Sequence, residues 1–182
     1  TKKEIFQYTV KGKQLNAVLL YPADYDKSKT YPLLVNIYED KTKELLAYMI
    51  PDLQDRMGIN IMHYLLQGYF VLLQDMNYDV GSAMASSIKT SIESALDQAL
   101  VKASIDENRV GIAGSSFGGY ETTLLMGISN RFRTGIAGVA VTDLPRKALS
   151  YIKELNRPEF WRIEQQQNRM GQSLFVDWNA YI

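Results

Sequence analysis

Gly-Ser-Ser-Phe-Gly-Gly, residues 114–119, is the stretch that decides the fold of this chain. It has the Gly-x-Ser-x-Gly spacing of a nucleophile elbow, in which a serine stands on a tight turn between a strand and a helix. The turn needs very small residues two positions to either side of the serine, because the backbone doubles back closely there. We therefore take Ser116 as the candidate nucleophile and Gly114, Gly118 and Gly119 as the elbow glycines.

The flanks of this stretch carry the argument, because a short pattern of glycine and serine often arises by chance. Residues 108–113 form an apolar run that is typical of a short buried strand, and residues 120–128 have the pattern of a helix. The order of strand, turn and helix is the one that an elbow requires. An ordinary strand-to-helix loop is the alternative interpretation.

The rest of the chain alternates short apolar runs with helical patterns. Residues 5–21 alternate around a turn at 11–13, which predicts an antiparallel hairpin with 14–21 as its second strand. We expect further strands at 33–38, 69–74, 108–113 and 134–141, the last of them buried under a closely packed helix, and helical segments within 39–67, 84–103 and 120–128. This order predicts an α/β fold, with a mainly parallel sheet, helices on both faces and an antiparallel pair at the start.

The composition is that of a globular chain with one core. Of the 182 residues 46% are hydrophobic, and 20 basic residues balance 20 acidic ones, so nothing favours a nucleic-acid partner. No apolar run reaches the roughly 18 residues of a membrane helix. The chain has no cysteine, which excludes disulfides and thiolate metal sites. No feature of the sequence fixes the cellular compartment.

Four polar residues stand where predicted strands end or have just ended. They are Tyr38, Asp75, Ser116 and Asp143. Active sites in sheets of this kind form at the carboxyl ends of the strands, so we expect these residues at one edge of the sheet.

Several stretches, taken in order, resemble the catalytic domain of the prolyl oligopeptidase family. Residues 31–38 (Tyr-Pro-Leu-Leu-Val-Asn-Ile-Tyr), 108–112 (Asn-Arg-Val-Gly-Ile) and 114–120 carry the likeness, and 132–140 and 168–171 (Asn-Arg-Met-Gly) add to it. The dipeptidyl-peptidase and acylaminoacyl-peptidase branches are the most similar. The elbow with its second glycine and following tyrosine is the specific part of this resemblance.

The resemblance implies a serine peptidase of the α/β-hydrolase fold that cleaves short peptides through an acyl-enzyme on Ser116. It implies an oxyanion hole made by the backbone N–H of Phe117 and the hydroxyl of Tyr38. No metal ion and no cofactor are expected. The family's whole proteins carry an upstream β-propeller, so the implied partners include this propeller and a downstream catalytic segment of the same chain.

The position of the single histidine does not fit the catalytic triad of a working serine hydrolase. In this fold the order is serine, acid, histidine, yet the single histidine, His63, precedes Ser116, and we interpret it as a structural or surface residue. Asp143 is interpreted as a loop or helix-capping aspartate. We therefore expect the acid, the histidine and the last strands beyond Ile182, with residues 1–182 a partial catalytic domain that alone hydrolyses very little.

Two polar stretches of the sequence need an interpretation, and two alternative functions stay open. Residues 75–81 read as a surface loop rather than a calcium site, because the later acid of an EF-hand loop is missing. Residues 159–162 and 165–167 read as packing and solvent-facing side chains, with the lining of a substrate cleft as the alternative. A carboxylesterase-like hydrolase, or a noncatalytic binding module of a larger assembly, stays open beside the peptidase.

Overall fold

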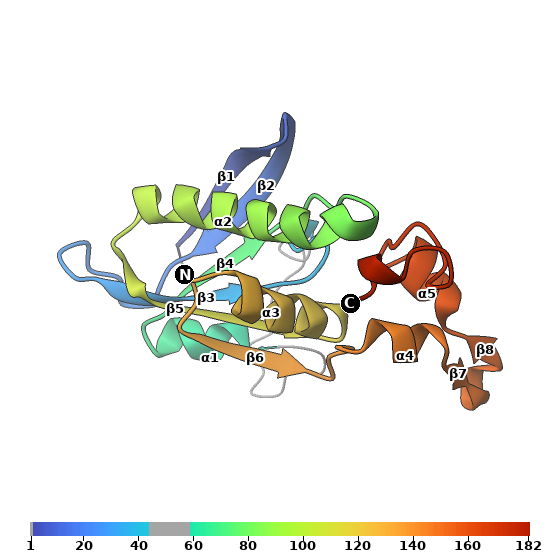
Figure 1. Ribbon diagram of the computed structural model, residues 1–182. Coiled ribbons are helices and arrows are strands. Elements are labelled where there is room, and N and C mark those ends of the chain that lie inside the picture. The colour runs from blue at the N-terminus through green and yellow to red at the C-terminus, as the bar shows by residue number, and fades with distance from the viewer. Residues whose placement is uncertain (1, 44–58) are drawn as a thin grey trace.

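The computed structural model describes residues 2–43 and 59–182, and at its centre lies a six-stranded sheet (Figure 1). The order across the sheet is β1-β2-β4-β3-β5-β6. The strands are β1 Lys3–Val10, β2 Lys13–Leu20, β3 Tyr31–Asn36, β4 Phe70–Gln74, β5 Ile105–Ser115 and β6 Thr134–Gly138. β2 pairs antiparallel with β1 and with β4, and all other neighbours are parallel. The predicted α/β fold is confirmed.

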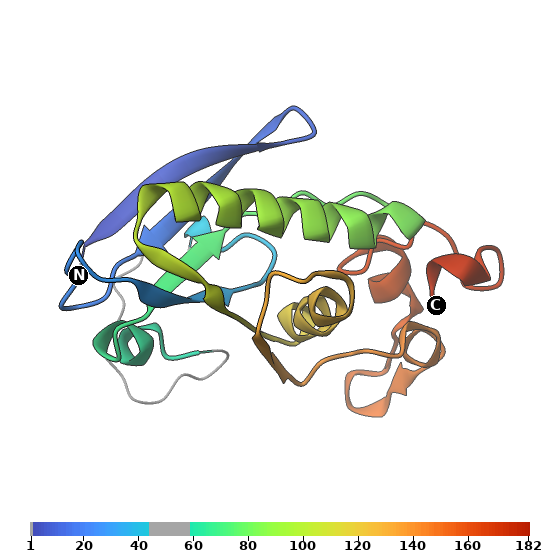
Figure 2. The ribbon, with the colours of Figure 1, turned by 60° about the vertical axis from the view of Figure 1, so that its left-hand side comes forward.

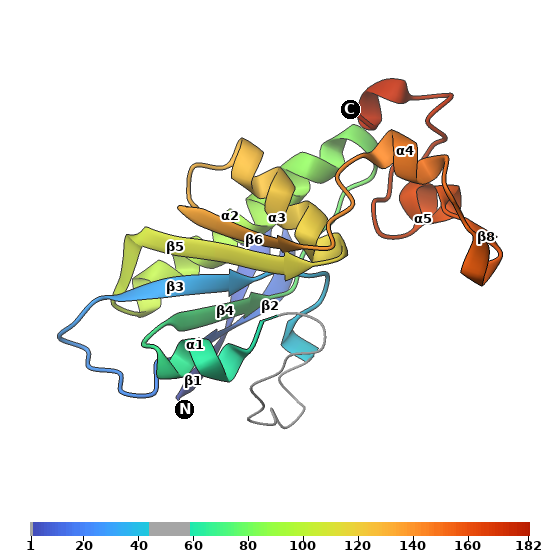
Figure 3. The same cartoon turned by 90° about the horizontal axis from the view of Figure 1, so that it is seen from below.

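Helices cover both faces of the sheet. α2 (Met84–Lys102) and α3 (Phe117–Ile128) lie side by side on one face, and the short α1 (Ile61–Leu66) lies on the other (Figures 2 and 3). Because neighbouring residues of a strand point to opposite faces, Leu72 packs into the core under α2 while Leu73 packs with Leu65 of α1.

The helix α2 is held by both its apolar and its polar residues. Ile88, Ile92 and Leu96 are fully buried and recur at the four-residue spacing of one helix face. Two serines on the same helix are buried as well. The Ser91 hydroxyl accepts from the Asn77 N–H at 3.1 Å, and the Ser87 hydroxyl accepts from the Asp79 N–H at 2.9 Å. The loop between β4 and α2 is thereby fixed against the helix.

Two elements, α3 and β6, have ends that differ from the predicted ones. α3 begins at Phe117 rather than at residue 120, because Gly118 and Gly119 lie inside its first turn despite their low helix propensity. β6 ends at Gly138, three residues early, because Val139 adopts a left-handed backbone with φ 44° that no strand can continue. Of the helical pattern predicted within 39–67, residues 44–58 lie outside the described residues.

The strand predicted at 134–141 is present, but the prediction that it is buried was wrong. β6 is an edge strand within the described part of the chain, and its residues are largely exposed because they have one neighbouring strand and one covering helix. The expected close packing of that helix is confirmed. A Cβ at Gly135 would lie 2.8 Å from the Met126 Cγ of α3, so a larger residue would force the Met126 side chain to move.

The C-terminal part of the chain lies beyond the carboxyl ends of the parallel strands (Figures 1 and 3). Its elements are α4 Leu144–Ala148, the two-stranded ribbon of β7 Tyr151–Ile152 and β8 Arg157–Pro158, α5 Phe160–Gln165 and the 3-10 turn η4 Trp178–Ala180. This segment covers the edge of the sheet where the site is expected. Within residues 2–43 and 59–182, no helix is long and apolar enough to cross a membrane.

Candidate active site

Ser116 stands on the sharp turn between β5 and α3. Its backbone has φ 57° and ψ −117°, a conformation that costs a residue with a side chain about 1–3 kcal/mol and persists only when its surroundings enforce it. Two hydrogen bonds do so. The Ser116 N–H donates to the Gly138 carbonyl at 2.8 Å, and the Tyr120 N–H donates to the Ser116 carbonyl at 3.1 Å. The end of β6 and the first turn of α3 thus hold the strained residue.

The three glycines around Ser116 lie where the backbone leaves no space for a side chain. A Cβ on Gly114 would lie 2.4 Å from the Gly118 carbonyl oxygen, and one on Gly118 would lie 2.3 Å from the Ile37 carbonyl oxygen. A Cβ on Gly119 would lie 2.6 Å from the Gly138 carbonyl oxygen. The turn therefore brings the end of β3, the elbow and the end of β6 together.

Tyr38 and Phe117 lie beside the elbow. Tyr38 follows β3 by two residues, and its ring meets the Phe117 ring edge-on with 6.4 Å between the centroids. The Tyr38 hydroxyl accepts from the Gln167 Nε2 at 3.0 Å. Phe117 is the first residue of α3, so its backbone N–H has no acceptor within the helix and is open to an external one. The residues predicted for the oxyanion hole are thus neighbours.

An aromatic cluster packs around Phe117, the residue after Ser116, and one of its tyrosines is bonded to a buried glutamate. The Phe117 ring stacks on Tyr120 at 5.8 Å and contacts Tyr78 at the same centroid distance. The Tyr78 hydroxyl donates to Glu121 Oε1 at 2.6 Å, and Glu121 is fully buried. The Arg169 guanidinium lies 4.3 Å from the centre of the Tyr78 ring.

The buried glutamate holds its proton to unusually high pH. The pKa of Glu121 is raised to about 8, chiefly by burial and also by the charge of Glu39, while the Tyr78 hydrogen bond and Arg169 oppose the change. Burial and the neighbouring Glu121 raise the pKa of Tyr78 well above its usual range. Arg169 is itself paired with Glu39 at 2.5 Å, so its charge is shared. Glu121 is therefore mostly neutral at pH 7.

Replacing Glu121 by glutamine is expected to change how stability depends on pH. The folded chain holds the Glu121 proton up to a pH of about 8, whereas an unfolded glutamate releases it near 4.5. The contribution of the Glu121 proton to the free energy of unfolding is therefore complete below pH 4.5. It falls by on the order of 4 kcal/mol as the pH rises towards 8. Glutamine does not titrate, so Glu121→Gln should match the natural protein at pH 5 and be clearly more stable at pH 8.5.

Urea unfolding at the two pH values measures this difference. Glu107→Gln, at an exposed position of β5, is the matched control and should leave the pH dependence as it is. An equal loss of stability between pH 5 and pH 8.5 in Glu121→Gln and in the natural protein would show that Glu121 is charged in the folded chain.

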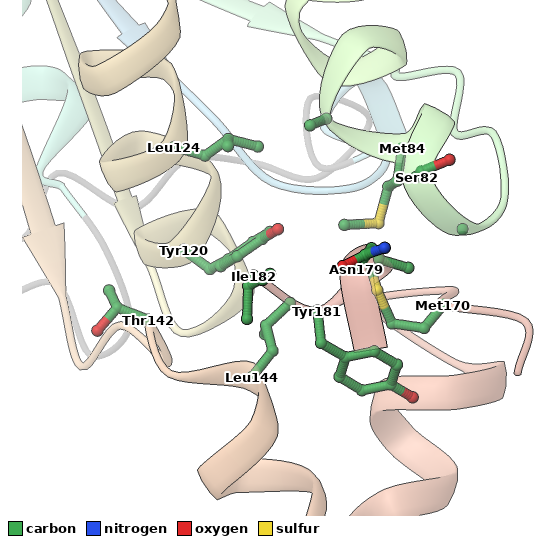
Figure 4. Close-up of a pocket in the computed structure, with 13 residues that line it drawn as sticks. Ser82, Met84, Tyr120, Leu124, Thr142, Leu144, Met170, Asn179, Tyr181 and Ile182 are labelled. Atoms are coloured by element: carbon green, nitrogen blue, oxygen red, sulfur yellow. The ribbon is translucent and has the colours of Figure 1, made fainter. Parts of the chain in front are cut away.

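Two cavities lie beside α3 and share Tyr120. The smaller, of about 160 Å³, has Ser116 on its wall. The larger, of about 280 Å³, lies between the start of α2, α3 and the last residues of the chain, and Figure 4 shows Tyr120, Met84 and Tyr181 around it. Only the smaller cavity has both Ser116 and Phe117 in its lining, so it is the one placed to receive a group bound at the elbow.

Other polar residues singled out from the sequence lie away from Ser116 or have structural partners. His63 is exposed in α1, on the opposite face of the sheet from α3. The Asp143 carboxylate caps α4 by accepting from the Arg146 N–H at 2.9 Å, which confirms its interpretation as a capping residue. Asp75 accepts from the Thr42 hydroxyl at 2.7 Å. No group of three or more metal-ligating side chains occurs within residues 2–43 and 59–182.

The sequence analysis did not predict the buried pair of Glu121 and Tyr78, and it gave little weight to the C-terminal residues that line the smaller cavity. Glu121 had a usable signal, because it stands four residues from both Phe117 and Leu125 on the inward face of α3, where a charged residue is unexpected. Glu159, Arg162 and Gln167 line the smaller cavity, whereas the other residues of 159–162 and 165–167 are not part of its lining.

Residues 89–180, half of the chain, match the family described as the prolyl oligopeptidase family. The chain belongs to this family. The matched region contains the elbow, α3, β6 and the C-terminal segment, and family members are serine peptidases. No curated relative matches the sequence.

Solved structures show the same fold over nearly the whole chain. An acylaminoacyl peptidase from Pyrococcus horikoshii aligns with a TM-score of 0.73 and 16% identity, covering 99% of this chain and 28% of that one. An acylaminoacyl peptidase in complex with Z-Gly-Gly-Phe-chloromethyl ketone aligns with a TM-score of 0.74 and 15% identity, with the same coverage. The chain thus spans little more than a quarter of these prolyl oligopeptidase-like proteins and matches their α/β-hydrolase portion.

Proposed function

We propose that Ser116 is the nucleophile of a serine peptidase that hydrolyses short peptides through an acyl-enzyme. The observation that carries the proposal is the strained backbone of Ser116, held on the turn between β5 and α3 by hydrogen bonds from both sides. Strain of this kind gathers at functional sites, and the turn presents the side chain at the carboxyl edge of the sheet. Membership of the prolyl oligopeptidase family supports the reaction class.

The chemistry assigned to Ser116 has two steps. Its Oγ attacks the scissile carbonyl carbon, the C–N bond breaks, and the amine leaves with a proton while an ester forms on the serine. Water then attacks the ester and releases the acid. The proton needs a base, and His63 lies across the sheet. We therefore assign the base to a histidine outside residues 1–182, in the order serine, acid, histidine.

The oxyanion formed in each step is assigned to Phe117 and Tyr38. The Phe117 N–H is free at the first position of α3, and the Tyr38 hydroxyl approaches from the end of β3. Donors that are fixed before the reaction stabilise the developing charge without reorganising. Gln167 supports this role, because its hydrogen bond to the Tyr38 hydroxyl leaves the tyrosine proton available to another acceptor.

A fluorophosphonate probe tests the nucleophile in the full-length protein. We expect a stable adduct whose mass maps to the tryptic peptide that carries Ser116. Turnover of an aminoacyl amide and of the matching ester, measured together, then separates a peptidase from an esterase. An unmodified Ser116 after prolonged treatment would contradict the proposal and favour a noncatalytic binding module.

Replacing Tyr38 by phenylalanine is expected to lower kcat about 100- to 1000-fold, the usual loss for one oxyanion donor. KM should change little, because the hydrogen bond forms in the transition state. Steady-state kinetics on a short peptide amide measure both constants. Tyr64→Phe, in α1 on the opposite face of the sheet, is the control and should keep both. A raised KM with a normal kcat would assign Tyr38 to substrate binding instead.

A further inference from the structure

The lining of the small cavity beside Ser116 is part apolar and part polar. Its apolar residues are Phe117, Tyr120, Val141, Ile152 and Ile163. Its polar residues besides Ser116 are Lys147, Glu159, Arg162, Gln167 and Asn168, which come from α4, from α5 and from the residues that flank α5. The volume of about 160 Å³ is below the ~300–1,000 Å³ typical of sites for drug-sized ligands, so the cavity suits one side chain.

The charges at this cavity do not balance. Glu159 is fully buried and has three cationic neighbours. Lys147 Nζ lies 3.3 Å and Arg162 Nε 3.5 Å from its Oε2, and an Arg157 terminal nitrogen lies 3.1 Å from its Oε1. Two of these cations, Lys147 and Arg162, line the cavity, where Glu159 is the only acid, so the lining carries one positive charge in excess.

Two buried donors at this cavity make no hydrogen bond within the described residues. The Asn168 Nδ2 has no partner, and the Arg162 Nε lies 3.5 Å from the Glu159 Oε2 as an ion pair without a hydrogen bond, so this oxygen is unbonded too. Asn168 is only 4% exposed, so leaving its donor unpaired carries a desolvation cost of about 1–3 kcal/mol. Both residues line the cavity, and a ligand with acceptor oxygens would satisfy both donors.

We propose that this cavity recognises a carboxylate on the substrate residue whose carbonyl Ser116 attacks, so that the enzyme cleaves after glutamate or aspartate. The inference rests on the proposed function of Ser116. A carboxylate supplies acceptors for the Arg162 and Asn168 donors and offsets the excess positive charge, and the methylene groups of a glutamate or aspartate side chain suit the apolar residues of the lining.

A basic substrate side chain is the alternative that the charges exclude. Glu159 is the only anion in the lining, and its two oxygens already face Lys147, Arg157 and Arg162. A further cation would meet net positive charge, because the unbonded acceptor, Glu159 Oε2, already lies within 3.5 Å of Lys147 Nζ and Arg162 Nε, at a site where burial weakens screening.

The experiment measures how fast matched covalent probes modify Ser116 in the full-length protein. Four peptidyl diphenyl phosphonates share one peptide and differ only in the residue at phosphorus, which is glutamate, glutamine, leucine or lysine. Intact-protein mass spectrometry gives the rate constant for each. We expect the glutamate probe to react about 10-fold faster than glutamine and 100-fold faster than lysine, the range of one charge-assisted contact.

Variants then assign the preference to the cavity. Arg162→Gln should lower the ratio of the glutamate rate to the leucine rate about 10-fold, because it removes one charge and one buried donor. Arg131→Gln is the matched control, since Arg131 pairs with Asp97 and is not part of the cavity lining. It should leave the ratio as it is. If Arg162→Gln fails to fold, the ranking of the four probes on the natural protein still decides the question.

The outcomes separate this inference from the proposed function. Modification of Ser116 by the leucine or lysine probe at least as fast as by the glutamate probe would overturn the carboxylate preference and leave the nucleophile intact. No adduct with any phosphonate or with a fluorophosphonate would overturn the nucleophile and the inference with it.

Discussion

Replacing Ser116 by alanine is expected to lower peptide hydrolysis by the full-length protein by a factor of about 10⁶, the loss seen when a serine nucleophile is removed. The reason is that the acyl-enzyme can no longer form, and the oxyanion donors alone give only the residual rate. Initial rates on a short peptide amide, with a limit set by active-site titration, measure the change.

Ser115→Ala is the matched control for this variant. Ser115 is the last residue of β5 and stands before the turn, where its backbone is not in the left-handed region. The rate should stay within a factor of about two of the natural one, because nothing assigns its hydroxyl to the reaction. Retained hydrolysis in Ser116→Ala, or loss in Ser115→Ala alone, would mean that another residue is the nucleophile.

Replacing Gly118 by alanine is expected to destabilise the fold by about 3 kcal/mol and to abolish modification of Ser116 by a fluorophosphonate. The added methyl group would lie 2.3 Å from the Ile37 carbonyl oxygen and 3.2 Å from the Tyr38 ring. Since the first of these is backbone, β3 and α3 must separate. That movement displaces both Tyr38 and the Phe117 N–H from Ser116.

Gly127→Ala provides an internal comparison on the same helix. Nothing lies within 4 Å of a Cβ at Gly127, so the same substitution should stabilise α3 by up to about 1 kcal/mol through helix propensity. Urea unfolding and the rate of fluorophosphonate modification measure both variants. Equal stability of the two would show that the close approach of Gly118 to β3 is not rigid.

The sequence could predict the elements because each has a local signature. The stripe at Ile88, Ile92 and Leu96 defines α2 without reference to any other element. The exposure of a strand has no such signature, which is why β6 was expected to be buried. A run such as 134–138 reads the same in the centre of a sheet and at its edge, because only pairing with other strands distinguishes the two.

The candidate site also has some residues that the sequence could predict and others that it could not. Ser116 and the glycines follow from spacing along the chain, since the turn that they form is local. The contact of Tyr38 with Phe117 joins residues 79 positions apart and was expected only through the family resemblance. The charge excess around Glu159 needs α4, β8 and α5 to meet, and no spacing in the sequence encodes that meeting.

By itself the sequence determined the order of strands and helices, the position of the elbow and the family, because periodicity and turn chemistry act over a few neighbouring residues. Only the tertiary structure decided that Glu121 is buried and neutral, and that two buried donors without hydrogen bonds line the cavity beside Ser116. Burial and charge pairing depend on which distant segments pack together, and these two effects set the chemistry of the site.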